Sequence, residues 1–141
     1  MRKIFSVCLL LFLVACQTVQ IHDSSHITEE EVVKALQDNG VNLAEAKFPR
    51  SVYGSKLGNA EPRTYEIGGK PIFIFEFKTE NDLEKGKKEF SKKTATMDLV
   101  SASSFEKRNI LIFYVHGQDL NSDNVPFEKE IQAVLDGIIE G

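Results

Sequence analysis

Residues 71–77 read Pro-Ile-Phe-Ile-Phe-Glu-Phe, a run in which Ile and Phe alternate, as is typical of a buried β-strand. Successive side chains of a strand point to opposite faces of the sheet. The run therefore carries apolar residues on both faces, with Phe73, Phe75 and Phe77 on one and Ile72 and Ile74 on the other. We expect this strand to be buried at least partly on both sides and to be central in a sheet.

Segments with strand-like composition occur in pairs, and each pair is joined by a short turn. The predicted strands cover residues 64–67, 71–77, 97–107 and 110–116. Gly68-Gly69 suits the tight turn of the first hairpin, and the second hairpin turns near Arg108-Asn109. The alternation in Ile-Leu-Ile-Phe-Tyr-Val after that turn predicts a second central strand.

Helix signals separate and follow the hairpins. They predict helices over residues 29–39, over about 79–93, and from Pro126 onward. Thr28 and Glu31 form a capping box at the first helix, and Gly86 lets the second helix approach the sheet closely. The sequence therefore predicts a single α+β domain of order α-β-β-α-β-β-α, in which helices pack on a mainly antiparallel sheet of about four strands.

The N-terminal segment has the features of an export signal. Arg2 and Lys3 precede an apolar run at 4–14, which is shorter than the roughly 20 residues that span a bilayer as a helix. The run ends in Leu13-Val14-Ala15-Cys16, which resembles the lipobox of bacterial lipoproteins. The resemblance implies that residues 1–15 are a cleaved signal peptide and that Cys16 carries a diacylglycerol as the mature N-terminus.

Residues 16–27 are polar and lack helical or strand periodicity, so we expect a flexible tether between lipidated Cys16 and an α+β domain at 28–141. Together with stretches such as Thr-Glu-Asn-Asp-Leu-Glu-Lys-Gly, the pattern resembles small uncharacterised lipoproteins of Gram-positive bacteria. The resemblance implies a protein held at the cell membrane by membrane lipid and facing the extracytoplasmic side. It identifies neither catalytic nor binding residues.

The composition limits the chemistry of the domain. Without Arg2 and Lys3, the basic residues fall from 17 to 15 against 21 acidic residues, a formal charge of about −6. This balance argues against nucleic acid as a partner and against general attraction to anionic lipid. Both cysteines lie within the first 16 residues, so the domain has no disulfide, no Cys-ligated zinc and no thiol nucleophile. His22 and His26 lie in the predicted tether, and we expect neither a metal nor a cofactor.

Two short matches to catalytic motifs do not predict an enzyme. Ser104 and Lys107 match S-x-x-K, and residues 122–124 match S-D-N, a pair found in penicillin-interacting serine enzymes. Those enzymes place Ser and Lys one helical turn apart, whereas here both lie in a predicted strand and point to opposite faces. His116, at a strand end, is the remaining candidate for a catalytic base, but no Asp or Cys follows or precedes it at a spacing that indicates a catalytic pair. We therefore expect no catalytic residues.

Two functions from different classes remain open. The first is a non-enzymatic interaction or accessory module at the outer face of the membrane, with an unknown protein partner. The alternative is a small-ligand binder or sensor that uses the 41–63 loop, with Tyr53, Lys56 and Arg63 as contacts. A pocket beside that loop, lined with aromatic residues and one or two cations, would favour the binder, and a flat exposed patch would favour a protein partner.

Overall fold

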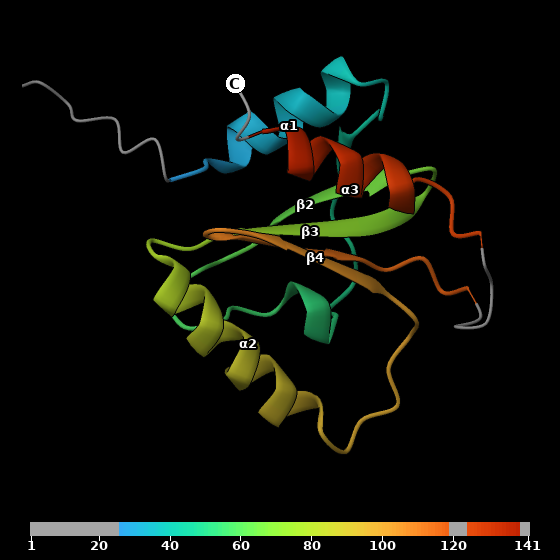
Figure 1. Cartoon of the computed structure of the whole chain (residues 1–141). Coiled ribbons are helices and arrows are strands. Elements are labelled where there is room, and N and C mark those ends of the chain that lie inside the picture. Colours follow the sequence, from blue (N-terminus) through green and yellow to red (C-terminus); the bar gives the residue numbers. More distant parts are fainter. Residues whose placement is uncertain (1–25, 119–123, 139–141) are drawn as a thin grey trace, which may run out of the picture.

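The computed structural model describes residues 26–118 and 124–138 (Figure 1). Cys16 and residues 16–25 of the predicted tether lie outside these ranges. The elements are α1 (Glu29–Asp38), β1 (Ala44–Glu45), the 3-10 helix η1 (Val52–Gly54), β2 (Arg63–Ile67), β3 (Lys70–Glu76), α2 (Glu80–Thr94), β4 (Ser103–Lys107), β5 (Ile110–Tyr114) and α3 (Glu128–Gly137). Within the described ranges, no helix has both the length and the apolar character needed to cross a bilayer.

The strands form one antiparallel sheet in the order β1-β2-β3-β5-β4. The predicted α+β class is confirmed, and β3 and β5 are interior strands that pair Phe73 with Phe113 and Ile74 with Ile112. The sheet has five strands where about four were expected. The additional strand, β1, has two exposed residues without apolar alternation, so the sequence carried no signal for it.

Both faces of the sheet carry an apolar core. One core includes Ile72 and Ile74 of β3 with Ile110, Ile112 and Tyr114 of β5. The other core includes Phe73, Phe75 and Phe77 with Leu111, Phe113 and Val115. The alternation predicted for both strands is confirmed. Each fully buried Ile or Phe side chain contributes about 1.5–3 kcal/mol relative to an exposed one, so this double burial is the main stabilising feature.

Helices cover the two faces separately (Figure 1). The isoleucine core is covered by α1 and α3, through Val32 and Leu36 of α1 and Ile131 and Leu135 of α3. The phenylalanine core is covered by α2 and by the segment 52–60 that contains η1. Thr28 and Glu31 make the predicted capping box at the start of α1. The result is a three-layer arrangement with the sheet in the middle.

Two element boundaries differ from the prediction. β4 begins at Ser103 rather than at residue 97, and Met97, Leu99 and Val100 are exposed in the loop before it. The apolar content of that loop resembled a strand, but no neighbouring strand pairs with it in the described sheet. The last helix begins at Glu128 rather than at Pro126, because Phe127 has a left-handed backbone (φ 68°) that interrupts helical geometry there.

The contact between α2 and the sheet depends on a glycine. A Cβ atom at Gly86 would lie 2.7 Å from Cε1 and from Cζ of Phe77. Phe77 is 4% exposed, and its ring stacks on Phe75 at a centroid distance of 6.1 Å. Gly86 therefore permits the close approach that its position in the sequence predicted.

We predict that Gly86→Ala destabilises the domain, although alanine is favoured over glycine in a helix by about 1 kcal/mol. Displacing the Phe77 ring costs roughly 1–3 kcal/mol, so the free energy of unfolding should fall by about 1 kcal/mol. Gly137→Ala is the matched control, because it also lies in a helix and a Cβ there meets nothing within 4 Å. Urea unfolding followed by circular dichroism measures both variants. Equal stability changes in the two would contradict the close packing of α2 on Phe77.

Candidate functional site

The chain that leads to Cys16 joins the domain through Asn109. The Ile27 amide donates to Asn109 Oδ1 (2.8 Å), and Asn109 Nδ2 donates to the Ile27 carbonyl (2.8 Å) and to the Phe77 carbonyl (3.0 Å). Ile27 and Asn109 are 3% and 2% exposed. One buried amide side chain in the β4–β5 turn therefore holds the first residues of the domain.

Glu76 and Glu29 extend this junction. Glu76 Oε1 contacts His26 Nε2 (3.0 Å), and Glu76 Oε2 accepts from the Glu29 amide (2.8 Å). The buried Glu29 carboxylate accepts from the Tyr65 hydroxyl. The pKa of Tyr65 is raised to about 12, mainly by burial and next by this hydrogen bond to Glu29. The tether predicted over 16–27 is therefore wrong at its last two residues, since His26 and Ile27 belong to the folded domain.

The three predicted ligand contacts do not form a site. Tyr53 is a core residue, 7% exposed, whose hydroxyl donates to the Val100 carbonyl (2.7 Å); burial raises its pKa. Arg63 forms an exposed ion pair with Glu45 (2.8 Å), and the hydrogen bond to Glu45 raises its pKa. Lys56 is exposed beside α2. The prediction that the Tyr53 ring contacts a ligand is corrected, because this ring fills the phenylalanine core.

A pocket of about 350 Å³ lies beside the 41–63 loop, and we call it the Phe77 pocket. It forms where the 57–60 turn, the end of β3 and the first turns of α2 meet. Mutual backbone hydrogen bonds between Leu57 and Ala60 (3.0 Å each) close the turn. The lining residues are Leu57, Gly58, Asn59, Ala60, Glu76, Phe77, Lys78, Asp82 and Lys85. Its volume is at the lower end of the roughly 300–1,000 Å³ found for small-molecule sites.

The Phe77 pocket has an apolar floor and a charged rim. Leu57, Ala60 and Phe77 are buried and form the floor. On the rim, the side chains of Lys78, Asp82 and Lys85 make no hydrogen bond or ion pair within the part of the chain that the structure describes. The Glu76 carboxylate is engaged by His26 and the Glu29 amide, which leaves two ammonium groups and one carboxylate above the apolar floor without partners among the described residues. This set matches a small molecule that carries both signs of charge.

A second polar cluster joins Ser103, His116 and Glu128. His116 is 4% exposed; its Nε2 lies 3.2 Å from Ser103 Oγ, and Ser103 Oγ donates to Glu128 Oε1 (3.0 Å). The Gln118 amide donates to His116 Nδ1 (3.0 Å), so the neutral ring carries its proton on Nε2. Nε2–H therefore donates to Ser103. A nucleophilic serine needs the opposite direction, with its hydroxyl donating to the imidazole, so His116 does not activate Ser103 in this arrangement.

The strand register brings this cluster together, and no motif in the sequence predicted it. Ser103 pairs with Tyr114, and His116 follows Tyr114 by two residues, so Ser103 and His116 share a face. The period-two pattern could have identified this pair, but Glu128 comes from α3 and carried no local signal. Ser104 and Lys107 of the S-x-x-K match both lie on β4, as expected. Three residues apart on a strand, their side chains point to opposite faces. Ser122 and Asp123 of the S-D-N match lie outside the described residues.

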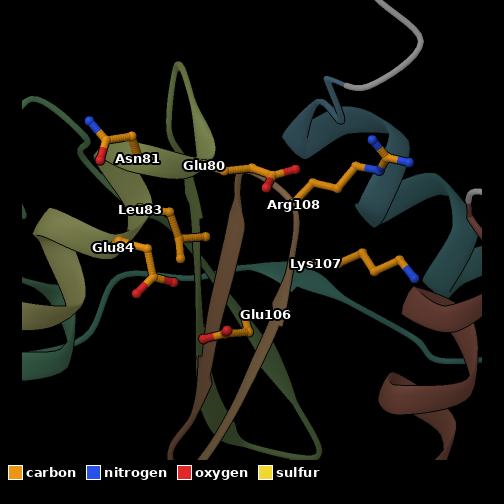
Figure 2. A pocket seen from close by; sticks show the side chains of 7 residues that line it. All are labelled: Glu80, Asn81, Leu83, Glu84, Glu106, Lys107 and Arg108. Carbon is orange, nitrogen blue, oxygen red and sulfur yellow. The ribbon is translucent and has the colours of Figure 1, made fainter.

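An open hollow flanks the start of α2 on the side away from the Phe77 pocket (Figure 2). Its volume is about 490 Å³, and it is lined by Glu80, Asn81, Leu83, Glu84, Glu106, Lys107 and Arg108. Lys87 forms ion pairs with both Glu84 (3.2 Å) and Glu106 (2.8 Å). Figure 2 shows Lys107 and Arg108 extending away from Leu83. Across residues 26–118 and 124–138, no group of three or more His, Cys, Asp or Glu side chains is arranged to hold a metal ion.

We predict that Asn109→Ala lowers the free energy of unfolding by about 2–3 kcal/mol, because it leaves buried backbone groups of Ile27 and Phe77 without partners. Limited proteolysis should then cleave near Ile27 much faster than in the wild type. Asn109→Asp is the matched variant, since it retains an acceptor for the Ile27 amide and loses both donated bonds. Unchanged stability in both variants would show that Asn109 does not hold the N-terminal segment.

Comparisons with known proteins assign no family to this chain. No protein-family model, no curated protein and no solved structure matches it. The candidate sites are therefore defined by the contacts of the chain's own residues: the Asn109 junction, the Phe77 pocket and the exposed loop before β4.

Proposed function

We propose that the protein is a lipid-anchored, extracytoplasmic interaction or accessory module without enzymatic activity, attached to the cell membrane through Cys16. The observation that carries this proposal is an exposed apolar tip in the loop before β4. Met97, Leu99 and Val100 are 52%, 39% and 60% exposed, and they are the exposed large apolar side chains of the described residues. Clustered apolar exposure of this kind is typical of a contact surface.

The apolar tip lies at the end of the sheet opposite the Asn109 junction. Asn109 is in the turn that precedes β5, and Gly117, just beyond β5, donates to the Ser101 carbonyl (2.9 Å). At roughly 3.3 Å per residue, the chain from Asn109 to Gly117 spans about 25 Å. The domain is therefore tethered at one end and presents the apolar tip at the other.

We predict that the full chain, expressed in a Gram-positive host with radioactive palmitate, is labelled and sediments with membranes. Cys16→Ala should abolish the label, because it removes the thiol that receives the lipid. Cys8→Ala is the matched control, since it removes the other cysteine and leaves the lipobox intact. Unlabelled wild-type protein released to the medium would contradict the anchor.

The Phe77 pocket favours a second candidate function, the binding or sensing of a small ligand. It lies beside the 41–63 loop and combines the Phe77 ring with the ammonium groups of Lys78 and Lys85. These features support a binder, just as the exposed apolar tip supports a contact surface for a larger partner. We now propose Lys78 and Asp82 as the ligand contacts, instead of Tyr53 and Arg63.

We predict that a zwitterion such as glycine, glutamate, lysine or alanyl-alanine shifts the amide NMR signals of Gly58, Asn59 and Lys78. A charged hydrogen bond contributes about 1.5–3 kcal/mol, so Lys78→Gln should weaken binding by roughly tenfold or more. Lys47→Gln is the control, because it removes an exposed lysine that does not line the pocket. If none of these compounds shifts the signals, the pocket is not a site for zwitterions.

A further inference from the structure

α2 has two chemically different sides. Leu83 and Gly86 are buried against the sheet. Lys85, Lys88 and Lys92 lie on the opposite side, because positions i, i+3 and i+7 of a helix share one face, and all three are exposed. We call these three residues the lysine row. They form a straight line of positive charge along the outside of the helix.

Beyond the first turn of α2, the other charged side chains on its flanks are paired. Lys87 contacts Glu84 and Glu106, and Lys93 contacts Glu89 (2.9 Å). In contrast, no carboxylate of the described residues lies within ion-pair distance of the lysine row. The row is therefore a local cationic strip on a protein whose net charge is negative, and its charges are available to an external anion.

The lysine row leads directly into the apolar tip. α2 ends at Thr94, and the Met97 amide donates to the Thr94 carbonyl (3.0 Å). The Val100 carbonyl accepts from the Tyr53 hydroxyl, which ties the backbone of the tip to the core while its side chains face outward. Asp98, also exposed, is the acidic residue of the tip. A cationic strip that ends in exposed apolar side chains matches an anionic bilayer, whose headgroups attract lysine and whose interface accepts apolar groups.

The position of the anchor makes this contact geometrically accessible. Phe77, whose carbonyl accepts from Asn109, lies just before α2, so the helix starts near the anchor junction and runs to the apolar tip (Figure 1). α2 is about 22 Å long at 1.5 Å per residue. The chain from Cys16 to His26 reaches at most about 35 Å. A bilayer that holds Cys16 can therefore also lie along α2.

We propose that the lysine row and the apolar tip together form a docking face that lays α2 along the anionic surface of the bilayer. This inference rests on the proposed function and names the bilayer as the partner of the apolar tip. The net charge of the mature chain, about −6, repels such a surface, so attraction requires a local cationic face such as this one. The domain then lies on the membrane instead of standing away from it.

The test uses tryptophan fluorescence, because the chain contains no tryptophan. Val100→Trp places the probe in the apolar tip, and Gln132→Trp places a matched probe on exposed α3. The chain from Cys16 onward is coupled through the Cys16 thiol to a maleimide lipid, so docking is measured whether or not cells acylate Cys16. Vesicles contain brominated phosphatidylcholine with or without phosphatidylglycerol. We expect bromine quenching of the Val100→Trp probe with phosphatidylglycerol and little quenching of the Gln132→Trp probe.

Replacing the lysine row by glutamine in the Val100→Trp background should remove most of this quenching. For the uncoupled chain, each lysine contributes roughly fivefold, so partitioning into phosphatidylglycerol vesicles should fall about 100-fold. The control replaces Lys34, Lys47 and Lys129 by glutamine, which changes the net charge equally on other exposed parts of the chain. The control should retain both quenching and partitioning.

Equal quenching of the two probes, or quenching that is unchanged without the lysine row, would overturn the docking face. A tip that crosslinks to a membrane or wall protein and shows no quenching would overturn it as well. The fatty-acid labelling of Cys16 in cells is a separate readout. Quenching without cellular labelling would support the docking face and refute the natural anchor. Labelling without quenching would support the anchor and refute the docking face.

Discussion

The pairing of β3 with β5 is the constraint on which the rest of the structure depends. These strands are interior in the sheet, and both of their faces are apolar, so each face must be shielded from water. α1 and α3 shield the isoleucine face, and α2 with the 52–60 segment shields the phenylalanine face. A sheet buried on one side alone would expose an entire row of Phe or Ile side chains.

Double burial also determines where functional groups can lie. Because both faces of the sheet are covered, the exposed chemistry is found at strand ends, in loops and on the outer sides of helices. The Phe77 pocket forms at the end of β3, the apolar tip precedes β4, and the lysine row lies outside α2. The polar residues that are buried serve the fold: Asn109 holds Ile27, and His116 is held by Ser103 and the Gln118 amide.

α2 links the proposals about function. Its inner side depends on Gly86, which brings the helix against Phe77, and its first turns supply Asp82 and Lys85 to the Phe77 pocket. Its outer side carries the lysine row, and its C-terminal end leads to the apolar tip. A helix with a thin apolar stripe is marginal alone, so its position is set by contact with the sheet. The same contact orients Asp82, Lys85 and the rest of the lysine row, which we assign to ligand or membrane binding.

Local patterns in the sequence are sufficient for the α+β class, the two central strands, the capping box of α1 and the role of Gly86, because each depends on residues close in the chain and on periods of 2 or 3.6. β1, the burial of Tyr53 and Ile27, and the late start of α3 could not be predicted in this way. The first two depend on contacts between distant segments: β1 pairs with β2, Tyr53 reaches Val100, and Ile27 binds Asn109. The late start of α3 follows from the left-handed backbone of Phe127, which no periodic pattern indicates. The Phe77 pocket likewise exists only after a turn, a strand end and a helix meet, since none of these segments forms a cavity alone. The resemblance of Leu13-Val14-Ala15-Cys16 to a lipobox is a local motif of the sequence, whereas the positions of the lysine row and the apolar tip, on which the proposed membrane contact rests, depend on how α2 packs on the sheet.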